Sequence, residues 1–205
     1  MTWLWFVAGA LLVAYLARRC FVRKVLAAVG RQAVDAAPDR IRLQAVSAHS
    51  WTDENAAESA TEALVENGFV EAGTYRVPEM PGVTVRLLAN PAESVYAAIY
   101  AHPQAGLWLD LFARYQGHTS VTFTTSRVPG LEARPGHRIV HAPGMSAFRL
   151  CERAFTEMPE GTLRPVSVDR AVHDFEEAYA ESVAWRKARG VSAREVAGVA
   201  RRKAA

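Results

Sequence analysis

Histidine is the residue type in this chain whose spacing first raises the question of metal chemistry. Of the six histidines in 205 residues, His137 and His141 are four apart, and on a helix this spacing would turn both rings toward one metal ion. Pro135-Gly136 before them and Ala142-Pro143-Gly144 after them favour a strand or loop instead. Four residues along a strand separate the two side chains by about 13 Å, which is too far for a shared ion. We therefore expect no metal site here.

Nucleophilic chemistry has little support in the sequence. Asp110, His118 and Ser120 supply the residue types of a catalytic triad, but a chain with six histidines offers such triples by chance. The sequence contains no phosphate-binding loop, dinucleotide fingerprint, nucleophile elbow, zinc-protease or EF-hand motif. Cys20 and Cys151 lie far apart without a CxxC pair, so they predict neither a disulfide framework nor a zinc site. We expect no catalytic residue and no cofactor.

The residues best suited to binding share one face of a predicted β-sheet. Apolar runs at 94–101, 107–115 and 119–126 are separated by turn residues, a pattern typical of an antiparallel meander. Because successive side chains of a strand point to opposite faces, the odd positions form an aliphatic face. The even positions form a mixed face of aromatic, hydroxyl and charged groups. We predict that six residues of this mixed face form the candidate binding surface: Tyr96, Tyr100, Trp108, Asp110, Phe112 and Arg114.

The pairing of these strands follows from the same alternation. Residues that face each other across two strands share a face, so an odd-length loop should place Leu111 opposite Phe123 and Ala113 opposite Val121. A two-residue turn at Gly117-His118 would instead set aliphatic side chains against hydroxyl groups. The hydrophobic pattern therefore predicts the odd-length loop.

Three interpretations of the mixed face remain open. The first is a solvated or helix-covered face stabilised by aromatic cross-strand pairs. The second is a docking surface for a ligand or a partner protein. The third is a stacking platform for single-stranded nucleic acid, which requires a positively charged groove. Residues 38–185 hold 12 basic and 19 acidic residues, and this net charge of −7 argues against the nucleic-acid interpretation.

Further elements must hold this sheet in place. The sequence predicts short strands at 41–46 and near 138–142, and helices at 53–67 and 145–158. Ser167 is expected to cap a longer helix that ends at Gly190, and Ser192 with Glu195 forms a capping box for a last basic helix. We predict an α+β fold with five or six mainly antiparallel strands packed with helices. The expected divisions are a membrane anchor with its basic flank (1–24), a helical linker with a short strand (25–52), a globular domain (53–160) and C-terminal helices with a basic tail (161–205).

The opening segment predicts a membrane anchor. Residues 1–17 carry no charged side chain, and as a helix they would measure about 26 Å, against a hydrocarbon core of about 30 Å. Positive charge follows the apolar run, which is the reverse of a cleaved secretory signal. A helix in the membrane plane or in a protein core is the alternative, but residues 3–17 show no polar face. We expect a single transmembrane helix with its basic flank in the cytoplasm, anchored by Trp3, Trp5, Tyr15, Arg18, Arg19, Arg23 and Lys24.

Positive charge gathers at the two ends of the chain. Residues 1–37 carry a net +4 and residues 186–205 a net +6, so the overall charge of +3 hides an acidic body. The segment RGVSAREVAGVARRK resembles the second half of many helix-turn-helix units, which leaves nucleic-acid binding open as an alternative. Attraction to the anionic cytoplasmic leaflet would account for the same charge.

Taken together, these patterns predict a single-pass membrane protein whose globular domain faces the cytoplasm and acts as a non-catalytic binding or scaffolding module. Its expected partners are the membrane, anionic lipid at the basic C-terminus, and a protein. A first alternative is a membrane-tethered enzyme with its site in loops 102–106 and 127–144. Nucleic-acid binding through the basic C-terminal helix is a second alternative, which the acidic body disfavours.

Overall fold

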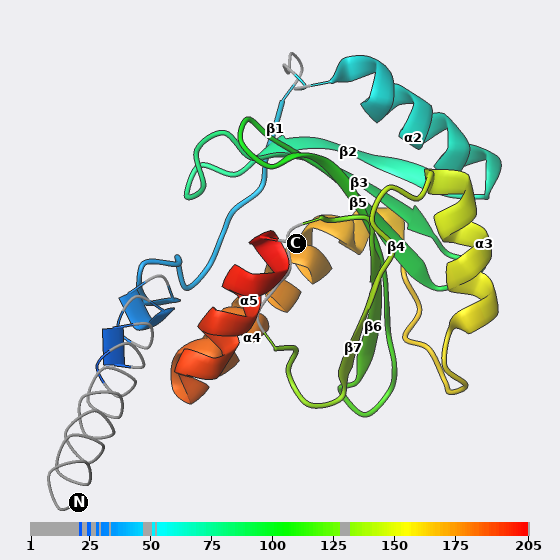
Figure 1. Ribbon diagram of the computed structural model, residues 1–205. Coiled ribbons are helices and arrows are strands. Elements are labelled where there is room, and N and C mark those ends of the chain that lie inside the picture. Colours follow the sequence, from blue (N-terminus) through cyan, green and yellow to red (C-terminus); the bar gives the residue numbers. More distant parts are fainter. Residues whose placement is uncertain are drawn as a thin grey trace, which may run out of the picture.

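A seven-stranded mixed sheet with helices on both faces forms the body of the protein (Figure 1). The computed structural model describes residues 21, 24–25, 28, 30–32, 34–46, 51, 53–127 and 132–204. The strands are β1 (Gln44–Ala45), β2 (Val70–Arg76), β3 (Thr84–Asn90), β4 (Val95–His102), β5 (Gly106–Arg114), β6 (Ser120–Thr124) and β7 (His137–His141). The helices are α2 (Glu54–Glu66), α3 (Ala147–Glu157), α4 (Ala171–Arg189) and α5 (Ala193–Ala204), with a short 3-10 helix at Val168–Arg170.

The strands follow one another across the sheet in chain order. Each neighbouring pair from β1 to β6 is antiparallel, whereas β7 runs parallel to β6 and places His137 beside Ser120. A parallel neighbour requires the chain to return along the length of the sheet, and the long connection between Thr124 and His137 makes this possible. The mainly antiparallel α+β fold is confirmed. The strand count exceeds the expected five or six because both short edge strands pair with the sheet.

The predicted register of the central strands is confirmed. Leu111 lies opposite Phe123 and Ala113 opposite Val121, as the hydrophobic alternation requires. In the turn between β5 and β6, Gly117 and His118 have positive φ angles of 96° and 64°. The chain therefore reverses sharply there, but the strands do not pair in the register that a two-residue turn would give. Both faces of the sheet therefore carry the side chains that the sequence assigns to them.

Two hydrophobic clusters cover the two faces of the sheet. The aliphatic face packs against α2 and α3, with Leu111, Phe123 and Leu150 almost completely buried. The mixed face packs against α4 and the 3-10 helix, where the ring of Phe175 lies 6.1 Å from that of Tyr100 on β4. Figure 1 shows α2 and α3 on one side of the sheet and α4 with α5 on the other. The mixed face is thus helix-covered over much of its area.

Of the two predicted helix caps, one is present, and Asp53 supplies a further one. The Asp53 side chain accepts a hydrogen bond from the Ala56 backbone N–H, and α2 begins there. The capping box before α5 is present, because Glu195 N–H donates to Ser192 Oγ and Ser192 N–H donates to the Glu195 carboxylate. The prediction for Ser167 is wrong, since its side chain makes no capping bond and a 3-10 turn precedes α4.

The predicted membrane anchor falls almost entirely outside the described residues. Trp3, Trp5, Tyr15, Arg18, Arg19 and Arg23 are not described, and Lys24 is exposed on a helical segment. Within the part of the chain that the structure describes, no helix has both the length and the apolar composition needed to cross a bilayer. The transmembrane span at 1–17 therefore stays a prediction.

A helical segment before β1 packs closely on α5. The described residues between 21 and 35 are helical, and a Cβ atom added at Gly30 would lie 2.7 Å from Val196 Cγ2. Val34 and Val191 are also buried, and Lys187 forms an ion pair with Asp39 at 2.7 Å. The residues that follow the predicted anchor are thus in contact with the C-terminal helices.

Candidate ligand-binding site

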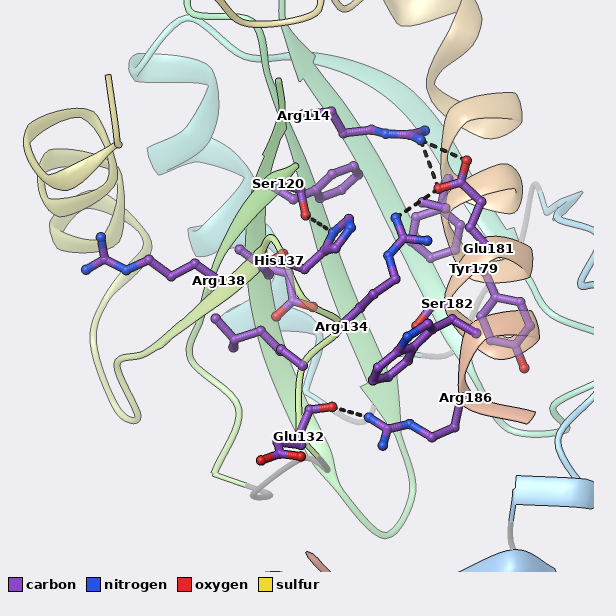
Figure 2. A pocket seen from close by; sticks show the side chains of 18 of the residues that line it. Arg114, Ser120, Glu132, Arg134, His137, Arg138, Tyr179, Glu181, Ser182 and Arg186 are labelled. Carbon is purple, nitrogen blue, oxygen red and sulfur yellow. Dashed lines mark hydrogen bonds and ion pairs between the residues drawn. The ribbon is translucent and has the colours of Figure 1, made fainter. Parts of the chain in front are cut away.

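A cavity of about 450 Å³ lies between the mixed face of the sheet and α4. Its floor comes from β5, β6 and β7, one wall from α4, and another from the segment 132–136 before β7 (Figure 2). Four of the six predicted binding residues line it, namely Tyr100, Asp110, Phe112 and Arg114. Alternation along β5 places the last three on one face, and the cross-strand register adds Tyr100.

The other two predicted residues, Tyr96 and Trp108, do not line the cavity. Tyr96 is only 3% exposed, and its hydroxyl donates to the Asp174 carboxylate of α4 over 2.7 Å. Burial and this hydrogen bond raise the pKa of Tyr96 to about 12, so the phenol stays protonated. Trp108 stacks on Tyr100 with ring centroids 4.7 Å apart and planes 9° apart. Both residues therefore support the aromatic wall from outside the cavity.

Asp110 is the most unusual polar group on the cavity floor. The register places it opposite Ala98 of β4 and Thr124 of β6. Its Oδ1 atom is shielded from solvent and accepts no hydrogen bond from any residue that the structure describes. Burial raises the pKa of Asp110 to about 6, although a hydrogen bond from Thr124 acts in the opposite direction. A carboxylate this poorly solvated costs free energy unless something compensates it.

A serine–histidine pair lies on the same floor, toward β7. Ser120 Oγ is 2.5 Å from His137 Nδ1, and a dashed line marks this contact in Figure 2. His137 Nε2 is buried and has no hydrogen-bond partner among the described residues. Burial, helped by the positive charge of Arg134, lowers the pKa of His137, so its ring is neutral at physiological pH. Sequence reasoning missed this pair because the parallel pairing of β6 with β7, which brings the two residues together, has no local signal.

Two arginines at the rim of the cavity, Arg114 and Arg134, are paired with carboxylates. Arg114 donates to Glu177 and Glu181 over 3.1 Å each, and Arg134 donates to Glu181 over 3.3 Å. Figure 2 shows both arginines directed toward Glu181. Burial tends to raise the pKa of Glu181, but the two guanidinium groups outweigh it and hold that pKa below its usual value. These positive charges are therefore balanced within the protein.

A second set of contacts closes the opposite end of the cavity. Arg186 donates to the backbone oxygen of Glu132 and forms an ion pair with Glu195 at 3.0 Å. The guanidinium of Arg186 also lies 4.6 Å from the ring centre of Trp185. Arg189 pairs with Glu132 and Glu195. The start of the basic tail thus serves to join α4 and α5 to the segment before β7.

The two loops predicted for an enzymatic site are placed differently. His102 Nδ1 accepts from the backbone N–H groups of Gln104 and Ala105, so its ring stabilises the β4–β5 turn, and no residue of 102–106 lines the cavity. The described part of 127–144 contributes six residues to the cavity: Glu132, Ala133, Arg134, His137, Arg138 and Ile139. His137 and His141 both belong to strand β7, as the sequence predicts, so the structure does not place them on a helix.

One group of side chains has the spacing of metal ligands. Candidate ligand atoms of His173, Asp174 and Glu177 lie within 4.8 Å of one another on α4. Asp174 already accepts from Tyr96 and Arg170, and Glu177 pairs with Arg114. These carboxylates have structural partners, so the group gives no support to a metal site.

Comparison with known proteins returned no match: no protein-family model, no curated protein and no solved structure resembles this chain at a significant level. The function must therefore be inferred from the chain itself.

Proposed function

We propose that this protein is a non-catalytic ligand-binding module, held at the cytoplasmic face of a membrane by its N-terminal segment, and that the cavity beneath α4 takes a small molecule. The sequence predicts the mixed face as a binding surface for a ligand or a partner protein, and we propose that a small ligand binds there, in the cavity. The protein partner expected at this face would have to displace α4, which is already packed on it.

One observation carries this proposal: the cavity floor holds polar atoms that lack partners. A volume of about 450 Å³ falls in the range of small-molecule sites, roughly 300–1,000 Å³. Asp110 and His137 both line the cavity, and the Oδ1 atom of the first and the Nε2 atom of the second are shielded and lack hydrogen-bond partners among the described residues. Buried polar groups in native proteins are nearly always satisfied, so a ligand that pairs with them would remove a free-energy cost.

Membrane attachment is supported by the charge pattern at the N-terminus. The uncharged stretch at 1–17 precedes four basic residues, which favours a cytoplasmic body. Contact of the C-terminal tail with anionic lipid belongs to the same proposal. Arg186, Lys187 and Arg189 are already in ion pairs, so this contact would have to come from residues further along the tail.

A second candidate function is hydrolysis by the Ser120–His137 pair. The 2.5 Å contact between Ser120 Oγ and His137 Nδ1 is the geometry of a nucleophile and its base. No described carboxylate contacts His137 Nε2 to orient the ring, which makes this candidate the weaker one. A fluorophosphonate probe that labels the wild type but not Ser120→Ala would favour it over simple binding.

A fragment screen by ligand-observed NMR tests the binding function. In the variant Ala178→Phe a bulky side chain on α4 fills the cavity, and we expect it to abolish binding of the fragments that bind the wild type. Ala184→Phe makes the same change at an exposed position of α4 and should leave binding unchanged. Fragments that bind both variants equally, or no fragment binding to the wild type, would refute the proposal.

Membrane fractionation tests the location. We expect the intact chain to stay in membranes washed with carbonate, and a reporter fused after residue 205 to give a cytoplasmic signal. Release of the intact chain by the carbonate wash would refute the proposed membrane anchor at the N-terminus.

A further inference from the structure

Asp110 lies between two pairs of aromatic rings on the floor of the cavity. On one side, Tyr96 and Phe112 face each other across β4 and β5 with ring centroids 5.4 Å apart. On the other side, Tyr100 and Trp108 stack at 4.7 Å. Because the residue opposite Asp110 is Ala98, no large side chain from β4 fills the gap between the two pairs. We call this arrangement the aromatic bracket.

Phe175 of α4 extends the bracket toward the helix. Its ring lies 6.1 Å from that of Tyr100, and both residues line the cavity together with Asp110 and Phe112. The carboxylate is thus reached through a space bordered by ring faces and edges. Aromatic rings attract a cation over their faces, because the quadrupole of each ring is negative there.

No positive group of the protein compensates Asp110 within the described structure. Of the four arginines that line the cavity, Arg114, Arg134 and Arg186 are paired with Glu177, Glu181, Glu195 and the backbone oxygen of Glu132. The fourth, Arg138, lies opposite Val121 of the aliphatic face, and Figure 2 shows its guanidinium directed away from Ser120 and His137. Desolvation raises the pKa of Asp110 and a hydrogen bond from Thr124 lowers it in part, and no cation contributes to the shift. A desolvated carboxylate without a counter-ion favours a positively charged ligand.

We propose that Asp110 and the aromatic bracket form the recognition site for a small organic ammonium ion. This inference rests on the proposed ligand-binding function and names the ligand class of the same cavity. The ammonium N–H donates to the Asp110 carboxylate, one oxygen of which accepts no hydrogen bond from the described residues, while the rings of Phe112, Tyr100 and Phe175 surround the rest of the cation.

A neutral donor could also reach Oδ1, so charge is the property to test. An alcohol of the same shape would donate one hydrogen bond but leave the carboxylate without a counter-ion. Hydrogen bonds between two charged groups are about twice as strong as neutral ones. We therefore expect an amine to bind roughly 10-fold or more tightly than its matched alcohol.

The experiment compares benzylamine with benzyl alcohol by isothermal titration calorimetry at pH 7.5, using the full chain in a non-ionic detergent. The wild type should bind the amine at least about 10-fold more tightly. Asp110→Asn keeps the shape of the side chain and removes its charge, so the two probes should then bind equally. Asp169→Asn removes the same charge from an exposed position on the 3-10 helix and should keep the wild-type preference.

A second variant guards against a folding defect in Asp110→Asn. Phe112→Leu retains an apolar side chain but loses one ring of the bracket, and it should weaken binding of the amine more than binding of the alcohol. Equal affinity of both probes for the wild type would overturn the ammonium site and leave the binding function intact. If neither probe binds but other fragments do, the ammonium site is likewise overturned and the binding function stands. If no fragment binds at all, both proposals are overturned.

Discussion

The raised pKa of Asp110 makes the stability of this protein depend on pH in a defined direction. Its folded-state pKa is about 6, against 3.8 for the ordinary side chain, which is a difference of about two units. Each unit corresponds to about 1.4 kcal/mol, so full burial would amount to about 3 kcal/mol. Because the residue as a whole is only partly buried, solvent screening reduces this figure, and we expect about 1–3 kcal/mol.

The sign follows from proton binding in the two states. Between pH 4 and pH 6 the folded protein holds a proton on Asp110 more often than the unfolded chain does, so stability from this group is lost as pH rises through about 6. Asp110→Asn cannot titrate at this position. The free energy of unfolding of the variant, relative to the wild type, should therefore increase by about 1–3 kcal/mol between pH 4 and pH 7.

Urea denaturation followed by tryptophan fluorescence at half-unit pH steps measures this difference. All other titrating groups are shared by the two proteins and cancel in the comparison. Asp169→Asn, which removes an exposed carboxylate, is the control and should not show the increase expected for Asp110→Asn. A flat difference for Asp110→Asn, or one that falls as pH rises, would refute the inference that Asp110 is a buried carboxylate without a counter-ion.

Two further predictions concern packing away from the cavity. Gly30→Leu would force a side chain into the contact with Val196, where even a Cβ atom lies 2.7 Å from Cγ2, and should destabilise the docking of α5 by about 1–3 kcal/mol. Hydrogen exchange should then accelerate in α5 but not in the central strands. Burial raises the pKa of Cys151 to about 12, so in Cys20→Ser at pH 8 its thiolate is about 1,000-fold rarer than in an ordinary cysteine, and thiol labelling should be slower by about that factor until the protein unfolds. Rapid labelling of the folded protein would contradict the buried position of Cys151.

Local pattern in the sequence was enough to predict the central sheet. The alternation along β5 and β6 makes only one register bury Leu111 against Phe123, because a slip by one residue would expose every aliphatic side chain. Capping chemistry is also local, and Ser192 with Glu195 predicted the start of α5. The six-residue mixed face followed from the same alternation, and four of its members line the cavity.

The site itself was decided by contacts between distant segments. Nothing near Ser120 in the sequence indicates that β7 returns parallel to β6 and places His137 beside it. Likewise, whether the mixed face meets solvent or a helix depends on where α4 packs, and the register of α4 over β4 and β5 is fixed by Phe175 and the hydrogen bond between Tyr96 and Asp174. The sequence by itself determined which side chains share a face. Only the tertiary structure decided that α4 would cover this face. It also decided that Asp110 would be desolvated without a positively charged partner among the described residues.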